Sequence, residues 1–185
     1  KDTVGGWLTD PGYERIVSKA KLLQEAGVLP KETTLAYRLL NRLHKYDERV
    51  ASFKPLFTES EEFIEEYPSS LFTTAMRKAR GDSLYARYRE TKEARYLKSA
   101  EGEYKAALRG PFKDRVPYIN AFSMLQRIAE EQNDRVLVQA WKDAQRKYRE
   151  EIDQRPSLRL YKEGINSYLE EKGLLDKSTT QGPRR

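Results

Sequence analysis

Cysteine is absent from this chain of 185 residues, and histidine occurs once, as His44. Without thiols the chain has no disulfide, no thiolate metal ligand and no cysteine nucleophile. The single imidazole leaves a zinc site short of ligands, and Asn41 stands where a di-iron helical motif has glutamate, three residues earlier. We therefore interpret His44 as an ordinary helix residue and predict no catalytic residue, no metal and no cofactor. The protein is expected not to be an enzyme and to occupy a reducing intracellular compartment.

Long hydrophobic runs are also absent. The longest are a few residues, whereas a helix that spans a bilayer needs about 20 apolar residues, so no membrane span is predicted. No secretory hydrophobic segment opens the chain either. It begins at Lys1 rather than Met, which we interpret either as a processed chain that has lost a transit peptide or as a trimmed piece. The mitochondrial matrix or another organelle is the compartment that we consider first.

Charge is plentiful but unevenly spread. Charged residues make up 35% of the chain, its mean hydropathy is -0.87, and its net charge is +6. Residues 71–115 hold twelve basic and six acidic residues, and an acidic block at Glu59–Glu66 precedes them. The i, i+4 pairs Glu61/Glu65 and Glu62/Glu66 have the spacing for a cation or for acid–base chemistry, but solvated surface carboxylates are the favoured interpretation. We expect an electrically polarised molecule, which matters for docking.

The apolar residues recur with a helical period, and no stretch of strand length alternates with a period of two. We predict an all-α fold, an array of antiparallel helix hairpins with about nine helices, either repeat-like or an irregular bundle. Residues 1–9 are an extended arm, 10–175 a single helical domain and 176–185 a polar tail. Lys54-Pro55 is expected to break the second helix and Gly81 to close the fourth. The predicted helices are 10–27, 30–50, 58–67, 71–80, 82–91, 96–108, 117–131, 135–152 and 158–173.

The stretch 82–111 is the most informative, because it contains two apolar stripes. At about 100° per residue, Leu84, Tyr88 and Thr91 cluster near one azimuth, and the second stripe lies roughly 150° away. The second stripe consists of Leu97, Ala100, Tyr104, Ala107 and Leu108. One straight helix would have to bury two opposite faces. We therefore predict two antiparallel helices that break near residues 92–96 and end at Gly110-Pro111.

Residues 95–108 resemble the second half of a tetratricopeptide repeat, which has an aromatic residue, a small residue, a second aromatic residue and then Ala-Leu. These positions are occupied by Tyr96, Ala100, Tyr104 and Ala107-Leu108. Two departures are that Tyr88 stands where the family has glycine, and that the spacing from Tyr96 to Ala100 is one residue too long. The resemblance implies helix pairs that approach through small residues and bind protein on a concave helical face.

Arginine and tyrosine, which are favoured at interface hot spots, alternate in residues 85–96. We predict a non-catalytic scaffold or adaptor, an accessory subunit of a larger complex whose partners are other protein subunits. The alternative is an RNA- or DNA-binding protein that uses the basic, Tyr/Arg-rich surface of residues 77–115, because arginine contacts phosphate and tyrosine stacks on bases. The candidate contact residues are Trp7, Tyr85, Arg87, Arg89, Lys92, Arg95, Arg184 and Arg185.

Overall fold

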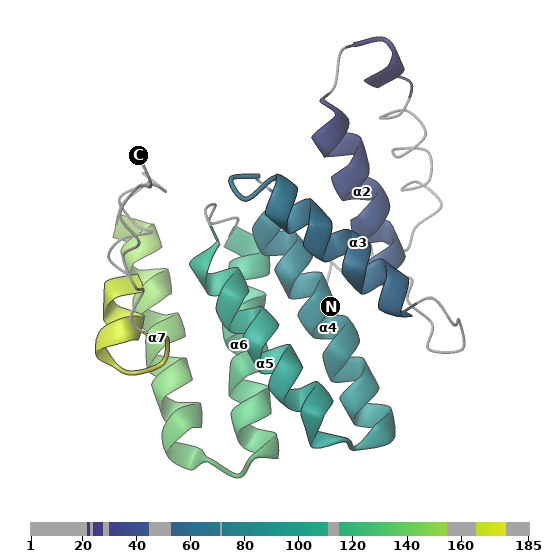
Figure 1. Cartoon of the computed structure of the whole chain (residues 1–185). Helices are drawn as coiled ribbons and strands as arrows, with labels where there is room; N and C mark the ends of the chain where they lie inside the picture. Colours follow the sequence, from purple (N-terminus) through teal and green to yellow (C-terminus); the bar gives the residue numbers. More distant parts are fainter. Residues whose placement is uncertain are drawn as a thin grey trace, which may run out of the picture. The chain divides into compact units, whose positions relative to one another are not determined.

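The computed structural model describes residues 22, 24–27, 30–44, 53–70, 72–110, 115–154 and 166–176, and all regular structure in them is helical (Figure 1). The helices are α2 (Lys31–His44), α3 (Phe53–Glu66), α4 (Thr73–Thr91), α5 (Ala94–Arg109), α6 (Arg115–Glu131) and α7 (Arg135–Gln154). A short helical stretch follows at 166–171. The predicted all-α class is confirmed. The count of nine helices and the repeat-like array stay predictions, and the arm at 1–9 and nearly all of the tail lie outside the described residues.

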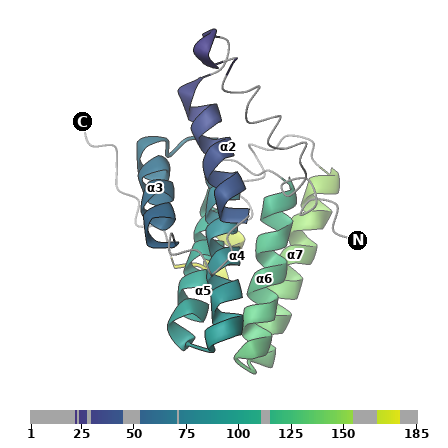
Figure 2. The same cartoon turned by 90° about the vertical axis from the view of Figure 1, so that its right-hand side faces the viewer.

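The chain divides into two compact units, residues 1–120 and 121–185, which are described separately. In the first unit α4 and α5 run side by side in opposite directions, and α2 packs on α3 and α4 (Figures 1 and 2). One apolar core joins α2, α3 and the first half of α4. Its most deeply buried members are Ala36, Leu39, Leu43, Leu56, Phe63, Met76 and Ala79. The prediction of one helical domain over 10–175 stays a prediction.

The predicted hairpin is confirmed. α4 ends at Thr91 and α5 begins at Ala94, so the chain reverses within two residues. Lys92 adopts a left-handed conformation with φ of 57°, and its N–H donates to the carbonyl of Tyr88 at 2.7 Å. All five residues of the second stripe are buried on α5, which ends at Arg109, next to Gly110. Periodicity therefore predicted both the break and the buried face of α5.

Gly81 does not close a helix, contrary to the prediction. It lies inside α4, which continues for ten more residues. A Cβ at Gly81 would stand 2.7 Å from Tyr104 Cε1, and the ring of Tyr104 is fully buried. Glycine is present because the ring of a neighbouring helix needs the space, and not because the backbone turns there.

Lys54-Pro55 does not break a helix either. α3 begins at Phe53, so Pro55 is its third residue, and the predicted start at Thr58 is five residues too late. The first N–H groups of a helix have no intrahelical partner, so a proline in the first turn removes no hydrogen bond. The predicted end of this helix at Tyr67-Pro68 is confirmed, because α3 stops at Glu66.

In the second unit α6 and α7 form a pair joined by residues 132–134. The ring of Phe122 packs against Trp141 and Tyr148, with centroids 6.2 and 5.6 Å away. The predicted buried residues of this pair are confirmed wherever the structure describes them, except that Leu137 is half-buried. They are Ala121, Phe122, Leu125, Ile128, Ala129, Trp141, Ala144 and Tyr148.

Two helix ends in this unit, the start of α7 and the stop at Gly173, are formed by standard capping interactions. Asp134 Oδ1 accepts from the N–H of Leu137 at 2.9 Å and so caps the start of α7. Gly173 has φ of 67°, and the N–H of Leu174 donates to the carbonyl of Leu169 at 2.9 Å. This is the helix stop predicted at Gly173, and Leu174 is buried beyond it.

None of the described helices is both long enough and apolar enough to cross a bilayer.

Candidate functional site

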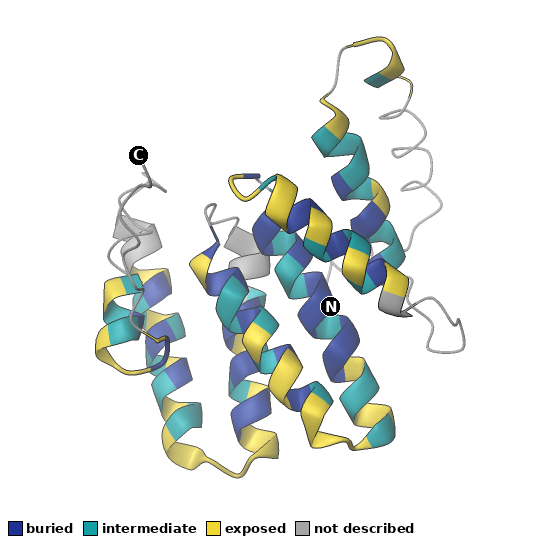
Figure 3. Cartoon of the chain, in the orientation of Figure 1, coloured by how far each residue is buried: buried dark blue, intermediate teal, exposed yellow. Residues whose placement is uncertain are grey.

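The turn between α4 and α5, together with the helix ends that flank it, is rich in basic residues, and we call residues 87–98 the basic turn. It contains five basic residues and two acidic ones. Figure 3 shows that α4 is largely buried in its first half and becomes exposed towards this turn. Its four exposed cations are Arg89, Lys92, Arg95 and Lys98, whereas Arg87 is half-buried. Cations near the C-terminal end of α4 also interact favourably with the helix dipole.

Two half-buried tyrosines lie among these cations. Lys92 Nζ is 5.3 Å from the centre of the Tyr88 ring. The guanidinium carbons of Arg95 and Arg87 are 4.8 and 5.8 Å from the centre of the Tyr96 ring. These distances are within the range of cation–π attraction, so the rings help to hold the cations at the surface.

The structure brings four of the predicted contact residues together in this turn: Arg87, Arg89, Lys92 and Arg95. It does not place Tyr85 with them. Tyr85 is 6% exposed and its ring lies 6.1 Å from that of Tyr88, so it is buried beneath the surface that the cations form. We therefore remove Tyr85 from the contact surface. Trp7, Arg184 and Arg185 lie outside the described residues.

Arg80 is the centre of an ionic network that ties α3, α4 and α5 together. Its Nε donates to Glu103 Oε1 at 2.8 Å, and its Nη2 lies 2.7 Å from Glu61 Oε2. Its Nη1 donates to the carbonyl of Phe57 and to Ser60 Oγ, both at 2.7 Å. The side chain of Arg80 is 9% exposed, so it is a nearly buried charge with partners on two neighbouring helices.

Arg77 binds the same two carboxylates. Its Nη1 donates to Glu61 Oε2 at 3.0 Å and to Glu103 Oε2 at 3.2 Å, and its Nη2 donates to Glu61 Oε1 at 3.0 Å. Burial acts to lower the pKa of the Arg77 guanidinium, but Glu103 and Glu61 outweigh it, so the pKa is raised above its usual value. The network therefore holds α3 and α5 on α4 by charge, in addition to the apolar core that α3 shares with α4.

This network removes residues from the basic contact surface that was predicted for residues 77–115. Arg77 and Arg80 were part of the basic range 77–115, and Glu61 was interpreted as a solvated carboxylate, but all three are used inside the fold. The position of Arg80 in the sequence already indicated that its side chain needs a partner inside the fold. Arg80 falls on the same stripe of α4 as Met76 and Ser83, both buried, so its charge required a buried partner.

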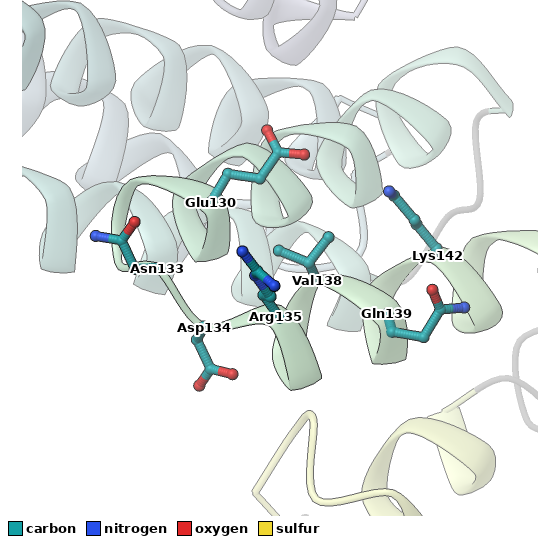
Figure 4. Close-up of a pocket in the computed structure, with 7 residues that line it drawn as sticks. All are labelled: Glu130, Asn133, Asp134, Arg135, Val138, Gln139 and Lys142. Carbon is teal, nitrogen blue, oxygen red and sulfur yellow. The ribbon is translucent and has the colours of Figure 1, made fainter.

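A separate feature of the second unit is an open hollow of about 600 Å³ beside the turn between α6 and α7 (Figure 4). Glu130, Arg135 and Lys142 bring charges of both signs to it, and all three side chains are exposed. Asp134 points away from them and caps α7. Exposed charges of mixed sign give no preference for one ligand, so we assign no function to this hollow.

In the part of the chain that the structure describes, no group of three or more His, Cys, Asp or Glu side chains is placed to hold a metal ion. Comparison of the chain with protein-family models, with curated proteins and with solved structures finds no match. A functional interpretation therefore depends on the geometry of the chain's own residues.

Proposed function

We propose that the protein is a non-catalytic helical scaffold or adaptor, an accessory subunit of a larger complex, and that the basic turn contacts an acidic surface of a partner protein. The observation that supports it is that Arg89, Lys92 and Lys98 are exposed and form no ion pair with any described residue. The ionic network around Arg80 holds the two helices that present them. The backbone that carries these cations is therefore already ordered before a partner binds.

Nucleic acid is the second candidate, because the same turn interleaves tyrosines with cations. A base that stacked on Tyr96 would compete with Arg87 and Arg95, which already lie near its ring. This favours a protein partner.

The proposal also includes a tetratricopeptide-like array of hairpins and an organellar complex. The burial of Ala100 and Ala107 in α5 supports the array. The organellar complex is supported by the composition of the chain alone.

The first test is the size of the chain's assembly in extracts of its own cells, with and without nuclease, combined with cross-linking mass spectrometry. We expect a large complex that survives nuclease, with cross-links from Lys92 and Lys98 to acidic segments of other proteins. A complex that falls to 21.6 kDa after nuclease would overturn the proposal and make nucleic acid the partner. Its affinity would then fall steeply on a log–log plot against salt.

A second test compares two triple variants of equal net charge. Arg89→Glu/Lys92→Glu/Lys98→Glu reverses the basic turn. The matched control reverses Arg38, Arg127 and Arg149, which are exposed and have no ion pair with a described residue. We expect the first variant to leave the complex and the control to remain in it, with equal helix content by circular dichroism. Equal loss from both would show that net charge matters and the basic turn does not.

A further inference from the structure

A second hollow, of about 510 Å³, lies in the first unit between the start of α2 and the connection from α3 to α4. Glu32 and Glu66 line it, and its walls include Tyr67 and Phe72 together with the rings of Pro30 and Pro68. We name it the acidic hollow. It therefore combines carboxylates with flat apolar surfaces.

Both carboxylates raise the pKa of the Tyr67 hydroxyl. The pKa of Tyr67 is raised above its usual value of 10.0, first by its hydrogen bond to Glu66, then by burial and by the charges of Glu66 and Glu32. Neither Glu32 nor Glu66 forms an ion pair with a described residue, although the chain carries a net charge of +6. Two helices thus bring to the same hollow negative charge that no ion pair with a described residue neutralises.

The lining is held in place by contacts behind it. Ser70, which is 6% exposed, donates to Glu32 and accepts from the N–H of Phe72 at 3.1 Å. The Phe72 ring meets Tyr37 edge to face, with centroids 5.3 Å apart. Tyr67 packs on Phe63 at 5.2 Å. A site whose walls are already ordered loses little entropy when a ligand enters.

We propose that the acidic hollow binds the cationic end of a basic side chain, foremost an arginine of a partner segment. The guanidinium meets Glu32 and Glu66, and its planar group and methylene stem lie along the aromatic and proline rings. A divalent metal ion takes six or more oxygen ligands, whereas much of this lining is ring carbon, so an organic cation matches it better. The acidic hollow shares no residue with the basic turn, so an experiment can refute the proposal for one site and leave the proposal for the other intact.

The test is a nuclear magnetic resonance titration of the full ¹⁵N-labelled chain. The probes are acetyl-Gly-Arg-Gly-amide, its Gln counterpart, which lacks the charge, and agmatine, which supplies a free guanidinium. The variants are Glu32→Gln and Glu66→Gln. The matched control is Glu65→Gln, because Glu65 is an exposed carboxylate of α3 outside the hollow that forms no ion pair with a described residue.

We expect saturable shifts of the amides of residues 32, 33, 66, 67, 69, 70 and 72 with the Arg peptide and none with the Gln peptide. Loss of one charged partner should weaken binding about tenfold in Glu66→Gln and in Glu32→Gln, and leave Glu65→Gln unchanged. Because Glu66 is exposed, its variant is expected to fold even if Glu32→Gln does not. Tighter binding of the peptide supports a protein segment as the source of the guanidinium, and tighter binding of agmatine would overturn that source in favour of a small free cation. Shifts that do not saturate, or that persist equally in Glu66→Gln, would overturn the proposal.

Discussion

Substitution by alanine should change the free energy of unfolding in opposite directions at Gly81 and Gly102, two glycines inside helices. In an exposed helix interior, glycine costs about 1 kcal/mol relative to alanine. Gly102 in α5 is exposed, and a Cβ there would have no heavy atom within 4 Å. Gly102→Ala should therefore raise the free energy of unfolding by about 1 kcal/mol, which is about 2–4 °C in Tm for a domain of 150–250 residues.

Gly81→Ala gains the same helix propensity but meets the ring of Tyr104. The added Cβ would lie 2.7 Å from Cε1 and 2.9 Å from Cδ1 and Cζ. The ring is fully buried, and its hydroxyl donates to Asp82 Oδ1 at 2.8 Å, so it has little room to move. Overpacking costs about 1–3 kcal/mol, and three ring carbons within 3 Å argue for the upper end. After the gain in propensity, the net loss is about 2 kcal/mol.

The assay is urea unfolding followed by circular dichroism, with midpoints compared at a common slope. The two variants should differ by about 3 kcal/mol, with the wild type between them. In a Tyr104→Leu background, Gly81→Ala should cost less than it does in the wild type, because the ring that the Cβ meets is gone. Equal stability of the two single variants would refute the close packing of α4 against Tyr104.

Three further predictions concern charges and caps. Glu103→Gln removes a carboxylate shared by two largely buried arginines and should cost about 3 kcal/mol in urea unfolding. Asp143→Asn, which loses a pair with the exposed Arg146 within α7, should stay within about 0.5 kcal/mol. Equal costs would contradict the network. The pKa of Tyr67 should fall towards 10.0 in Glu66→Gln, measured by the pH dependence of the ¹³Cζ signal, since the hydrogen bond that raises it most is lost. An unchanged value would place Glu66 away from that hydroxyl. Asp134→Ala should cost about 1 kcal/mol in thermal unfolding through loss of the cap of α7, and a neutral result would argue against that cap.

Local features of the fold were predictable from the sequence because they depend on neighbouring residues. The reversal between α4 and α5 follows from two stripes that one helix cannot bury together, and the stop at Gly173 follows from a backbone conformation that glycine adopts easily. The buried face of α7 follows from the spacing of Trp141, Ala144 and Tyr148. Each of these signals lies within one continuous segment, the longest of which runs from Leu84 to Leu108.

The candidate site was predictable only in part. Arg89, Lys92 and Arg95 are exposed in the basic turn, as expected of contact residues, because they surround a turn that no apolar stripe covers. Tyr85 was misplaced because it is one residue from Leu84 on the buried side of α4. Helical periodicity gives the direction of a side chain, but the width of the buried face depends on the helices that cover it.

The sequence by itself determined the helical class, the hairpin and most helix ends, since backbone propensity and apolar period act over short distances. Tertiary structure alone decided the role of Gly81, the partners of Arg80 and the placement of Glu32 and Glu66 around one hollow, because each depends on residues distant in the chain. Glu103 reaches Arg80 from 23 residues away, and Glu32 reaches Ser70 from 38. Which long-range partner stands opposite a residue follows from how the helices pack, and no local pattern contains that information.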